Sequence, residues 1–381
     1  MCDTRYTLNE KARNQQGLTL TELMVSLALT ATLTAGLVEV LVGMRQTETT
    51  QAAISRMQES ERFALGFLSN DLHMSGYVGC LSGIAAEDIQ NTLDGPPPAF
   101  QPDREIQGWE ADGTAPGDIN NRVDNVAVVS TGGGGWSASG ANVLETTSVV
   151  PGTDILRVWF MDEEDGDINS ITPGASTVVN TEALDIQDED ILLLSDCEQA
   201  AWVQACNVQS VGSPVTLNLT LSSGCNPGNV ANLSVGVSDD GKVAKLNGIM
   251  YYIGKRDDAA TNPPSLYRRR LTGSATLGAP EELVEGVADM QILYGENINN
   301  DNDRTADAYV TADQVTDWSN VVSVRISILV QSLEDYLVGD PQPYVFNAVS
   351  YDGEAGNGAL PDDGRLRRAF TATVGLRNRV L

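Results

Sequence analysis

The feature that most constrains this chain is an apolar run near its N-terminus, from Leu23 to Met44. Small and apolar residues fill the run almost throughout, and Glu39 is its main interruption. About 20 such residues in a helix are enough to cross the hydrocarbon core of a bilayer once. Arg5, Lys11 and Arg13 precede the run, and basic flanks stay on the cytoplasmic side. The sequence therefore predicts one membrane-spanning helix whose N-terminus is cytoplasmic.

An acidic residue, Glu22, stands at the very start of this run. An ionisable group at membrane depth costs on the order of 3 kcal/mol and usually has a partner. If the peptide bond after Gly17 is cut, Leu18 gains a free amine one helical turn from Glu22. The carboxylate can then neutralise the amine of its own chain or, better, that of a neighbouring subunit.

Two other interpretations of the N-terminus are open to test. An ordinary secretory peptide has a shorter apolar core followed by an Ala-x-Ala-like site, and the run here is too long and holds no such site. An uncleaved anchor with a stray Glu22 is the second interpretation. It would retain residues 1–17 in the mature protein.

Gly17, Leu18, the Thr-Leu-Thr that follows, Glu22 and the long apolar helix together resemble the class III signal of type IV prepilins. The resemblance implies that a prepilin peptidase removes the leader 1–17 and that Leu18 is methylated. It also implies that Glu22 docks one subunit onto the next. The family usually begins its mature chain with Phe, which Leu18 replaces here.

The helical pattern continues beyond the apolar run. Gln46 to His73 contains no proline, and its apolar residues recur at steps of three and four, the spacing of an amphipathic helix. Gly76 and Gly79 are the residues expected just past a helix end. We therefore expect one helix over 18–75, with about 23–44 in the membrane or a fibre core.

Cysteine usage is consistent with export. Cys2 lies in the leader, and the other cysteines are Cys80, Cys197, Cys206 and Cys225. An even number in an exported chain favours two disulfides, although four cysteines allow three pairings. We favour Cys197 with Cys206, which flank one short segment, and Cys80 with Cys225. A zinc site is the alternative, but Cys-x-x-Cys spacing is missing.

The rest of the chain reads as strands between turns. Residues 89–121 are rich in Pro, Gly and Asp and predict a long surface loop. Within Trp318–Ser332 and Leu366–Val380, apolar and polar residues alternate, which indicates strands with one face on a core. We also expect strands at Asn125–Ser130, Asp154–Met161, Asp190–Ser195, Val215–Leu221, Gly248–Gly254, Ser265–Leu271 and Val287–Tyr294. The predicted fold is α+β: a long N-terminal helix packed on a largely antiparallel sheet, with a β-rich domain over 76–381.

Several C-terminal stretches resemble the PilW family of minor pilins. They are Asp196-Cys197-Glu198, Leu266–Arg269, Gly286–Gln291 with Tyr294-Gly295, Val321–Ile328 and Arg367–Arg379, with Met74–Cys80 at the helix exit. Membership implies a subunit that joins other minor pilins and the major pilin at the fibre tip, primes polymerisation and presents a PilY-type adhesin. The implied location is the inner membrane with a periplasmic C-terminal domain, and then the pilus tip at the cell surface.

Composition and motifs argue against catalysis and nucleic-acid binding. The net charge of −29 repels nucleic acid at long range, and the single histidine, His73, stands on the predicted helix. We therefore expect a structural subunit without a cofactor. The alternatives are a type II secretion minor pseudopilin, which would share N-terminus and fold, and a membrane-anchored periplasmic enzyme.

One acidic loop resembles a calcium-binding pattern. Asn299, Asp301, Asp303 and Asp307 occupy the first, third, fifth and ninth places of a calcium loop. Arg304 replaces the turn glycine, and Val310 stands where a bidentate Glu is needed. A solvated acidic loop is the simpler interpretation, and calcium is kept as the alternative.

Overall fold

A computed structural model describes most of the chain. The residues that it describes are 19–79, 89–94, 104–111, 113–118, 149–172, 177–182, 185–196, 198–211, 216–221, 224–230, 233, 241–256, 262–271, 277–299, 305–354 and 357–378. Contacts divide the chain into two compact units, Met1–Ala52 and Ala53–Leu381. Each unit is described by itself below.

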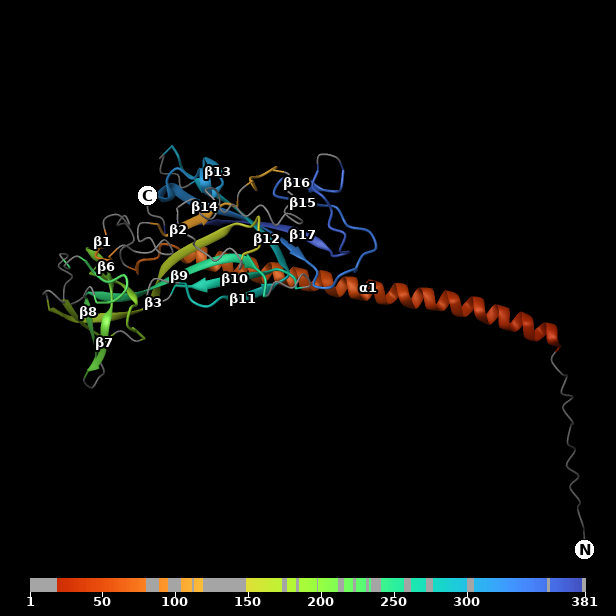
Figure 1. Ribbon diagram of the computed structural model, residues 1–381, viewed down its shortest axis with the longest axis horizontal. Coiled ribbons are helices and arrows are strands. Elements are labelled where there is room, and N and C mark those ends of the chain that lie inside the picture. The colour runs from red at the N-terminus through yellow and green to blue at the C-terminus, as the bar shows by residue number, and fades with distance from the viewer. Residues whose placement is uncertain are drawn as a thin grey trace, which may run out of the picture. The chain divides into compact units, whose positions relative to one another are not determined.

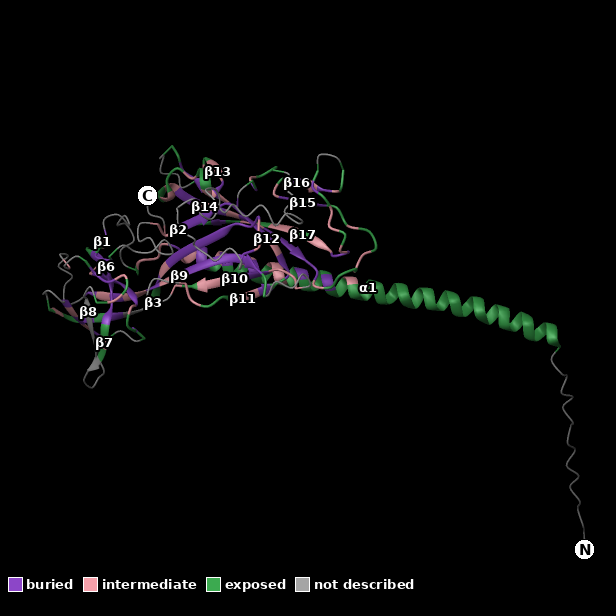
Figure 2. Ribbon diagram, in the orientation of Figure 1, coloured by how far each residue is buried: buried purple, intermediate pink, exposed green. Residues whose placement is uncertain are grey.

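A single helix, α1, covers Leu20–Met74, its 55 residues free of proline (Figure 1). This range agrees with the helix expected over 18–75. Every residue from Leu20 to Thr49 is exposed, and this segment is drawn green in Figure 2. Of the described helices, this is the one that is long and apolar enough to cross a membrane. Gly76 follows the last turn with φ +71, a conformation that favours glycine.

The part of α1 in the second unit buries one stripe of side chains. The buried residues are Ala53, Met57, Ala64, Leu68, Asp71 and Leu72. Their spacing of mostly three and four residues places them on one face of the helix. Of these, Met57, Ala64, Leu68 and Leu72 belong to one core cluster. It also contains Leu156 and Tyr251 of one sheet and Ile326 and Ile328 of another. This face of the helix therefore supplies part of the domain's own core.

The larger sheet contains eleven of the described strands. Its strand order is β1-β6-β5-β9-β3-β4-β8-β7, with β10 beside β9, β11 beside β10, and β2 beside β3. The bounds are β1 Gln90–Asn91, β2 Ile106–Trp109, β3 Ile155–Thr172, β4 Thr177–Thr181, β5 Ile191–Ser195, β6 Ala200–Gln204, β7 Cys206–Val211, β8 Thr216–Leu221, β9 Lys242–Gly254, β10 Ser265–Arg270 and β11 Glu281–Glu285. Of these pairings, β1 with β6 is parallel and the others are antiparallel.

A second, four-stranded sheet is antiparallel throughout its described pairs, in the order β13-β12-β14-β17. Its bounds are β12 Val287–Glu296, β13 Ala308–Val310, β14 Val321–Gln331 and β17 Arg367–Gly375, with short 3-10 helices η5 at Ala312–Gln314 and η6 at Trp318–Asn320. A hairpin of β15 (Tyr344–Phe346) and β16 (Val349–Tyr351) lies between β14 and β17 in sequence. From Val322 to Ile328, buried apolar residues of β14 alternate with half-buried ones, as its period of two predicts.

The α+β prediction is confirmed, and one local expectation is wrong. Residues 89–121 were expected to form a surface loop, yet they contribute β1 and the wholly buried β2. β2 is only four residues long, too short to show a period, and prolines flank it in sequence. Its Gly108 lies against Tyr294, whose hydroxyl would be 1.9 Å from an added Cβ, so a larger residue does not fit there. The strand expected at Asn125–Ser130 lies outside the described residues.

Candidate functional site

The start of α1 forms a capping box around Glu22. The Thr19 backbone N–H and the Thr19 hydroxyl both donate to Glu22 Oε2 at 2.9 Å, and the Glu22 N–H lies 3.4 Å from Thr19 Oγ1. A Thr followed three residues later by Glu is the sequence pattern of this arrangement. The reciprocal bonds hold the carboxylate back toward the N-terminal end of the helix. Gly17 and Leu18 lie outside the described residues, so the cleavage and methylation expectations stay predictions.

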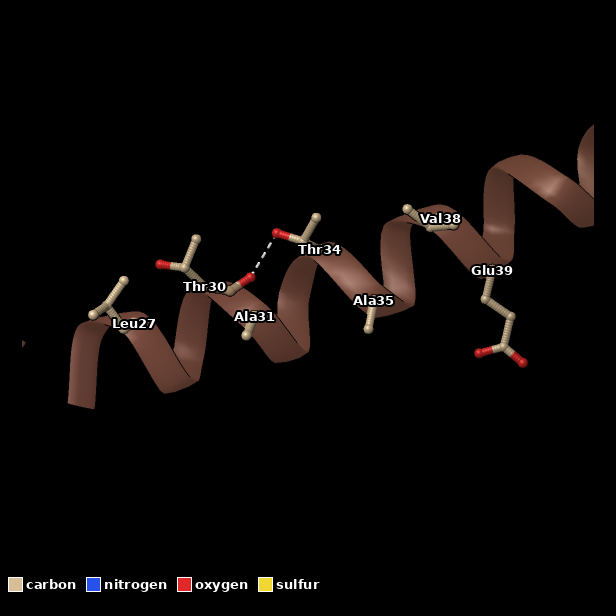
Figure 3. A pocket seen from close by; sticks show the side chains of 7 residues that line it. All are labelled: Leu27, Thr30, Ala31, Thr34, Ala35, Val38 and Glu39. Atoms are coloured by element: carbon tan, nitrogen blue, oxygen red, sulfur yellow. Dashed lines mark hydrogen bonds between the residues drawn. The ribbon is translucent and has the colours of Figure 1, made fainter. Parts of the chain in front are cut away.

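Hydroxyl groups along the apolar half of the helix are satisfied by the helix itself. Thr30 donates to the Ser26 carbonyl at 2.7 Å, and Thr34 donates to the Thr30 carbonyl at 2.6 Å (Figure 3). Such back-bonding to the preceding turn removes the need for water around a hydroxyl. The threonines of this segment are therefore compatible with a bilayer or an apolar fibre core.

One face of this half-helix presents small residues and ends on an acid. It is lined by Leu27, Thr30, Ala31, Thr34, Ala35, Val38 and Glu39 (Figure 3). Glu39 belongs to this apolar segment just as Glu22 does, but it lies more than four turns from the helix start. Only Glu22 is placed to meet an amine at position 18.

The C-terminal end of α1 is bound by the last described part of the chain. Asn378 Nδ2 lies within 3.0 to 3.2 Å of the carbonyl oxygens of His73, Met74 and Ser75. These carbonyls belong to the helix end, where acceptors have no partner within the helix. His73 Nδ1 also lies 3.2 Å from the Gly375 carbonyl oxygen. The histidine considered for catalysis thus takes part in this contact at the helix end.

Two buried carboxylates tie elements of the domain together. Asp71 of α1 accepts from the Tyr251 hydroxyl at 2.5 Å. Burial, reinforced by this carboxylate, raises the pKa of Tyr251. Asp154 accepts from the Ala111 N–H at 3.0 Å and from the Ile292 N–H at 2.8 Å, which joins the segment after β2 to β12. Both carboxylates have structural partners.

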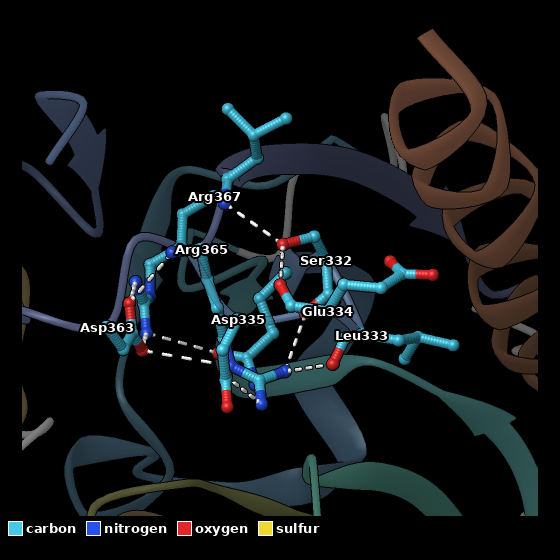
Figure 4. A network of polar contacts seen from close by, with 9 residues as sticks. Ser332, Leu333, Glu334, Asp335, Asp363, Arg365 and Arg367 are labelled. Carbon is cyan, nitrogen blue, oxygen red and sulfur yellow. Dashed lines mark hydrogen bonds and ion pairs between the residues drawn. The ribbon is translucent and has the colours of Figure 1, made fainter. Parts of the chain in front are cut away.

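The ion pairs around Arg365 form a second structural network (Figure 4). Arg365 is buried, donates to the carbonyls of Ser332 and Leu333 at 2.8 Å each, and forms an ion pair with Asp335. Burial alone would raise the pKa of the Asp363 carboxyl, but hydrogen bonds from Arg367 and the Arg365 N–H lower it. This network joins the two ends of the long connection between β14 and β17, because it links Arg365 to residues 332–335.

A disulfide joins Cys206 and Cys225, whose Cα atoms are 5.8 Å apart. The pairings favoured from the sequence, Cys197 with Cys206 and Cys80 with Cys225, are therefore wrong. The short segment between Cys197 and Cys206 is largely β6, and an extended strand holds its two ends apart. Cys80 and Cys197 themselves lie outside the described residues.

The calcium candidates are only partly described. The Asp307 carboxylate accepts from the backbone N–H groups of Ile298 and Asn299 at 2.8 and 3.1 Å, and from the Asn299 side chain at 2.9 Å. Asp301 and Asp303 lie outside the described residues, and the described part of the chain contains no cluster of metal-ligating side chains. Glu296, just before this loop, binds Thr316 and Asp317 instead.

Sequence reasoning missed Asp154 and Asn378 as key polar residues. Asp154 reaches partners 43 and 138 positions away, and Asn378 reaches 303 to 305 positions back. The chain has 52 acidic residues, and nothing in the sequence distinguishes Asp154 from the others. Asn378 lies within the strand expected over Leu366–Val380, so the alternation gave no sign that it binds the end of α1.

Comparisons with known families support this picture. The profile of the prokaryotic N-terminal methylation motif matches residues 12–38, which include Glu22. The profile of type IV pilus-assembly protein W matches residues 250–378, which run from the end of β9 to Asn378. No curated protein and no solved structure matches the chain significantly. The chain thus matches the prepilin-type methylation motif at its N-terminus and the type IV pilus-assembly protein W family over residues 250–378.

Proposed function

We propose that this protein is a minor pilin that joins a tip complex, primes pilus assembly and helps to display a tip adhesin. The two family matches support a type IV pilus-associated minor pilin, a structural kind of protein. The observation that carries the proposal is the capping box at the start of α1. It holds the Glu22 carboxylate one helical turn from the residue that cleavage after Gly17 would expose.

The assembly step follows from the energetics of that carboxylate. Glu22 Oε2 accepts both bonds from Thr19, and a carboxylate has a second oxygen, here Oε1, that can accept from a further donor. The Leu18 amine of an adjacent subunit is the charge-matched donor. In an apolar fibre core an unpaired carboxylate costs several kcal/mol, so the pair sets the register between subunits.

The proposed route begins at the inner membrane. The apolar half of α1 anchors the subunit there, with the β-rich domain in the periplasm, until prepilin peptidase has cut the leader. The subunit then passes into the fibre together with other minor pilins and the major pilin. Its place at the cell surface, near a PilY-type adhesin, is the last part of the proposal.

The test compares two acids of the same helix. Glu22→Ala and Glu39→Ala each remove one carboxylate from the apolar segment, and only Glu22 lies one turn from position 18. We expect Glu22→Ala to lower strongly the amount of this protein found in purified pili and to reduce the number of pili. Glu39→Ala should leave both quantities at the wild-type level. Normal piliation and incorporation with Glu22→Ala would contradict the proposal.

Mass spectrometry of the mature protein tests the processing step. The expected N-terminus is a methylated Leu18. A mature protein that keeps Met1 and residues 2–17, in cells with normal filaments, would overturn the assembly role. Recovery with a type II secretion complex and not with pili would instead indicate a pseudopilin.

Calcium binding by the loop at 299–307 is a separate and weaker proposal. Asp307 already accepts from Ile298 and Asn299, which supports a carboxylate that protein donors satisfy without an ion. Calorimetric titration of the protein with calcium tests it. A flat titration at millimolar calcium would remove the idea.

A further inference from the structure

The described sheet edges differ in how they are protected from pairing with other chains. An unpaired strand edge presents a row of N–H and C=O groups that can template another strand, and natural proteins shorten, kink or charge such edges. β1 and β13 have only two and three residues. β7 has a register shift and carries the Cys206–Cys225 disulfide. β11 has a register shift and three glutamates among five residues.

β17 has none of these protections along its middle. It is nine residues long, contains no proline, and pairs with β14 over nine positions without a register shift. Its residues 369–375, Ala-Phe-Thr-Ala-Thr-Val-Gly, include no charge. Among the described strands, none pairs with its other side. β17 is therefore the longest regular edge in the described part of the chain.

The hydrogen bonds at both ends of β17 show which backbone groups point outward. Leu366 accepts from the Ser332 N–H, and the Leu376 N–H donates to Val322, each at 2.9 Å. Antiparallel ladders alternate every second residue, so the even-numbered residues of β17 bond to β14. The odd-numbered residues, among them Ala369, Thr371 and Thr373, then direct N–H and C=O to the open side. The outward carbonyl of Gly375, which His73 approaches, agrees with this.

The two faces of β17 specify what a neighbouring strand would need. Phe370 packs against the core that contains α1, and Val374 belongs to that core. On the opposite face, Thr371 bonds to Ser327 at 2.9 Å and Thr373 is exposed. A strand added beside β17 would match both faces with alternating apolar and hydroxyl-bearing residues.

The charges at the ends of this edge select the partner. Arg368 and Arg377 are exposed at opposite ends of the uncharged stretch, in a chain whose net charge is −29. Antiparallel pairing of two β17 strands centred on Ala372 would bring Arg377 of each beside Arg367 and Arg368 of the other, and of these Arg367 is already ion-paired with Asp363. Such like charges oppose self-pairing, whereas acidic residues beyond both ends of a partner strand would be attracted.

We propose that the outer edge of β17 binds an extended segment of a different polypeptide by strand addition. The bound segment alternates apolar and hydroxyl-bearing residues and carries acidic residues at both ends. This surface is distinct from the Glu22 contact, so the inference does not rest on the proposed assembly role. Backbone bonds supply the affinity, and the end charges supply the selectivity.

The test uses the full chain in detergent micelles and three labelled nonapeptides. The probe is Asp-Asp-Val-Thr-Val-Thr-Val-Asp-Asp. One control replaces its four Asp residues with Lys, and the other carries N-methyl groups on its valines. Fluorescence anisotropy should show the probe bound at least about tenfold more tightly than either control, the effect of losing about 1.4 kcal/mol. Hydrogen exchange should slow in fragments that contain β17 and stay unchanged in those that contain β11.

Two sets of variants locate the binding. Thr373→Pro removes an outward N–H without touching the β14 ladder and should weaken probe binding about tenfold, while Thr373→Val should stay within about twofold. Melting temperatures check that both variants fold. Reversing both end charges, with Arg368→Glu and Arg377→Glu, leaves the backbone intact and should make the Lys-ended peptide the better ligand.

Three results would overturn the inference. The first is a wild-type chain that fails to bind the probe at about 1 mM, or that binds it no better than the controls. The second is binding that charge reversal leaves unchanged. The third is sedimentation of the wild-type chain as a dimer that Thr373→Pro dissociates, which would make the occupant a second copy.

Discussion

The two parts of helix α1 share one regular backbone but differ in the surroundings that their side chains require. From Leu20 to Thr49 every residue is exposed, and large apolar side chains point in all directions. From Ala53 to Leu72 one stripe is buried against the sheets of the domain. A helix that is apolar all round needs lipid or other helices, whereas a striped helix needs a single partner surface. Burial thus separates a segment that needs an apolar environment outside the domain from a segment that packs on its own domain.

The largest expected effect tests this difference directly. Leu68 is fully buried and Leu29 is 60% exposed, so the same truncation is applied to both parts of one helix. Leu68→Ala should lower the free energy of unfolding of the domain by about 2–5 kcal/mol, whereas Leu29→Ala should leave it unchanged. Denaturant unfolding of the full chain, followed by the fluorescence of buried Trp159 and Trp202, measures both. Equal losses of unfolding free energy in Leu68→Ala and Leu29→Ala would contradict the proposed difference between the two parts of the helix.

Polar groups sharpen the comparison next. Asp71→Ala leaves the buried Tyr251 hydroxyl without its carboxylate partner and should cost about 1–3 kcal/mol of domain stability. Adding Tyr251→Phe should recover part of that loss, because it removes the stranded hydroxyl. A double variant whose loss equals the sum of the two single losses would show that the pair is not coupled.

The pH dependence of a buried acid gives a third test. Burial and the nearby Glu110 carboxylate raise the pKa of Asp154 well above its ordinary 3.8. In the unfolded chain this carboxyl loses its proton near pH 3.8, whereas in the folded protein it keeps the proton to a higher pH. Its contribution to stability is therefore fully present below about pH 3.8 and is lost as the pH rises through the folded pKa. In Asp154→Asn, one of the two backbone N–H groups faces an amide NH₂, which cannot accept a hydrogen bond. We therefore expect the free energy of unfolding to fall by about 1–3 kcal/mol at pH ~4. The difference in stability between the wild type and Asp154→Asn should become smaller by about pH 8. Melting curves of both proteins at the two pH values measure this difference. A difference that grows with pH would contradict the prediction.

The smallest effect concerns the one described ion pair between α1 and the loop after β14. Arg56 lies 2.7 Å from Glu334, with both side chains about half exposed. Arg56→Ala should therefore change domain stability by only about 0–1 kcal/mol and less in high salt. A larger change, measured by the same unfolding experiment, would mean that the apolar stem of Arg56 supports the helix.

The parts of the fold that could be read from the sequence were those encoded by local repetition. The helix bounds and the alternation in β14 and β17 each rest on a period that a window of residues displays. Glu22 was also found from a local pattern, because it is an acid at the start of the apolar run and stands four residues after Leu18. The features that the sequence did not reveal depend on contacts between residues far apart in the chain. The Cys206–Cys225 pairing, the burial of β2 and the reach of Asp154 all depend on which distant strands become neighbours.

The contact of Asn378 with the end of α1 has a mechanical consequence. Its amide lies within 3.2 Å of three carbonyl oxygens at the helix terminus. Asn378 stands three residues after the end of β17, which pairs with β14 over nine positions. The end of the helix and the sheet are therefore coupled through one side chain that lies far from the helix in sequence. A displacement of the helix end loads this amide and the chain that leads from it into β17, so the two elements are expected to move together.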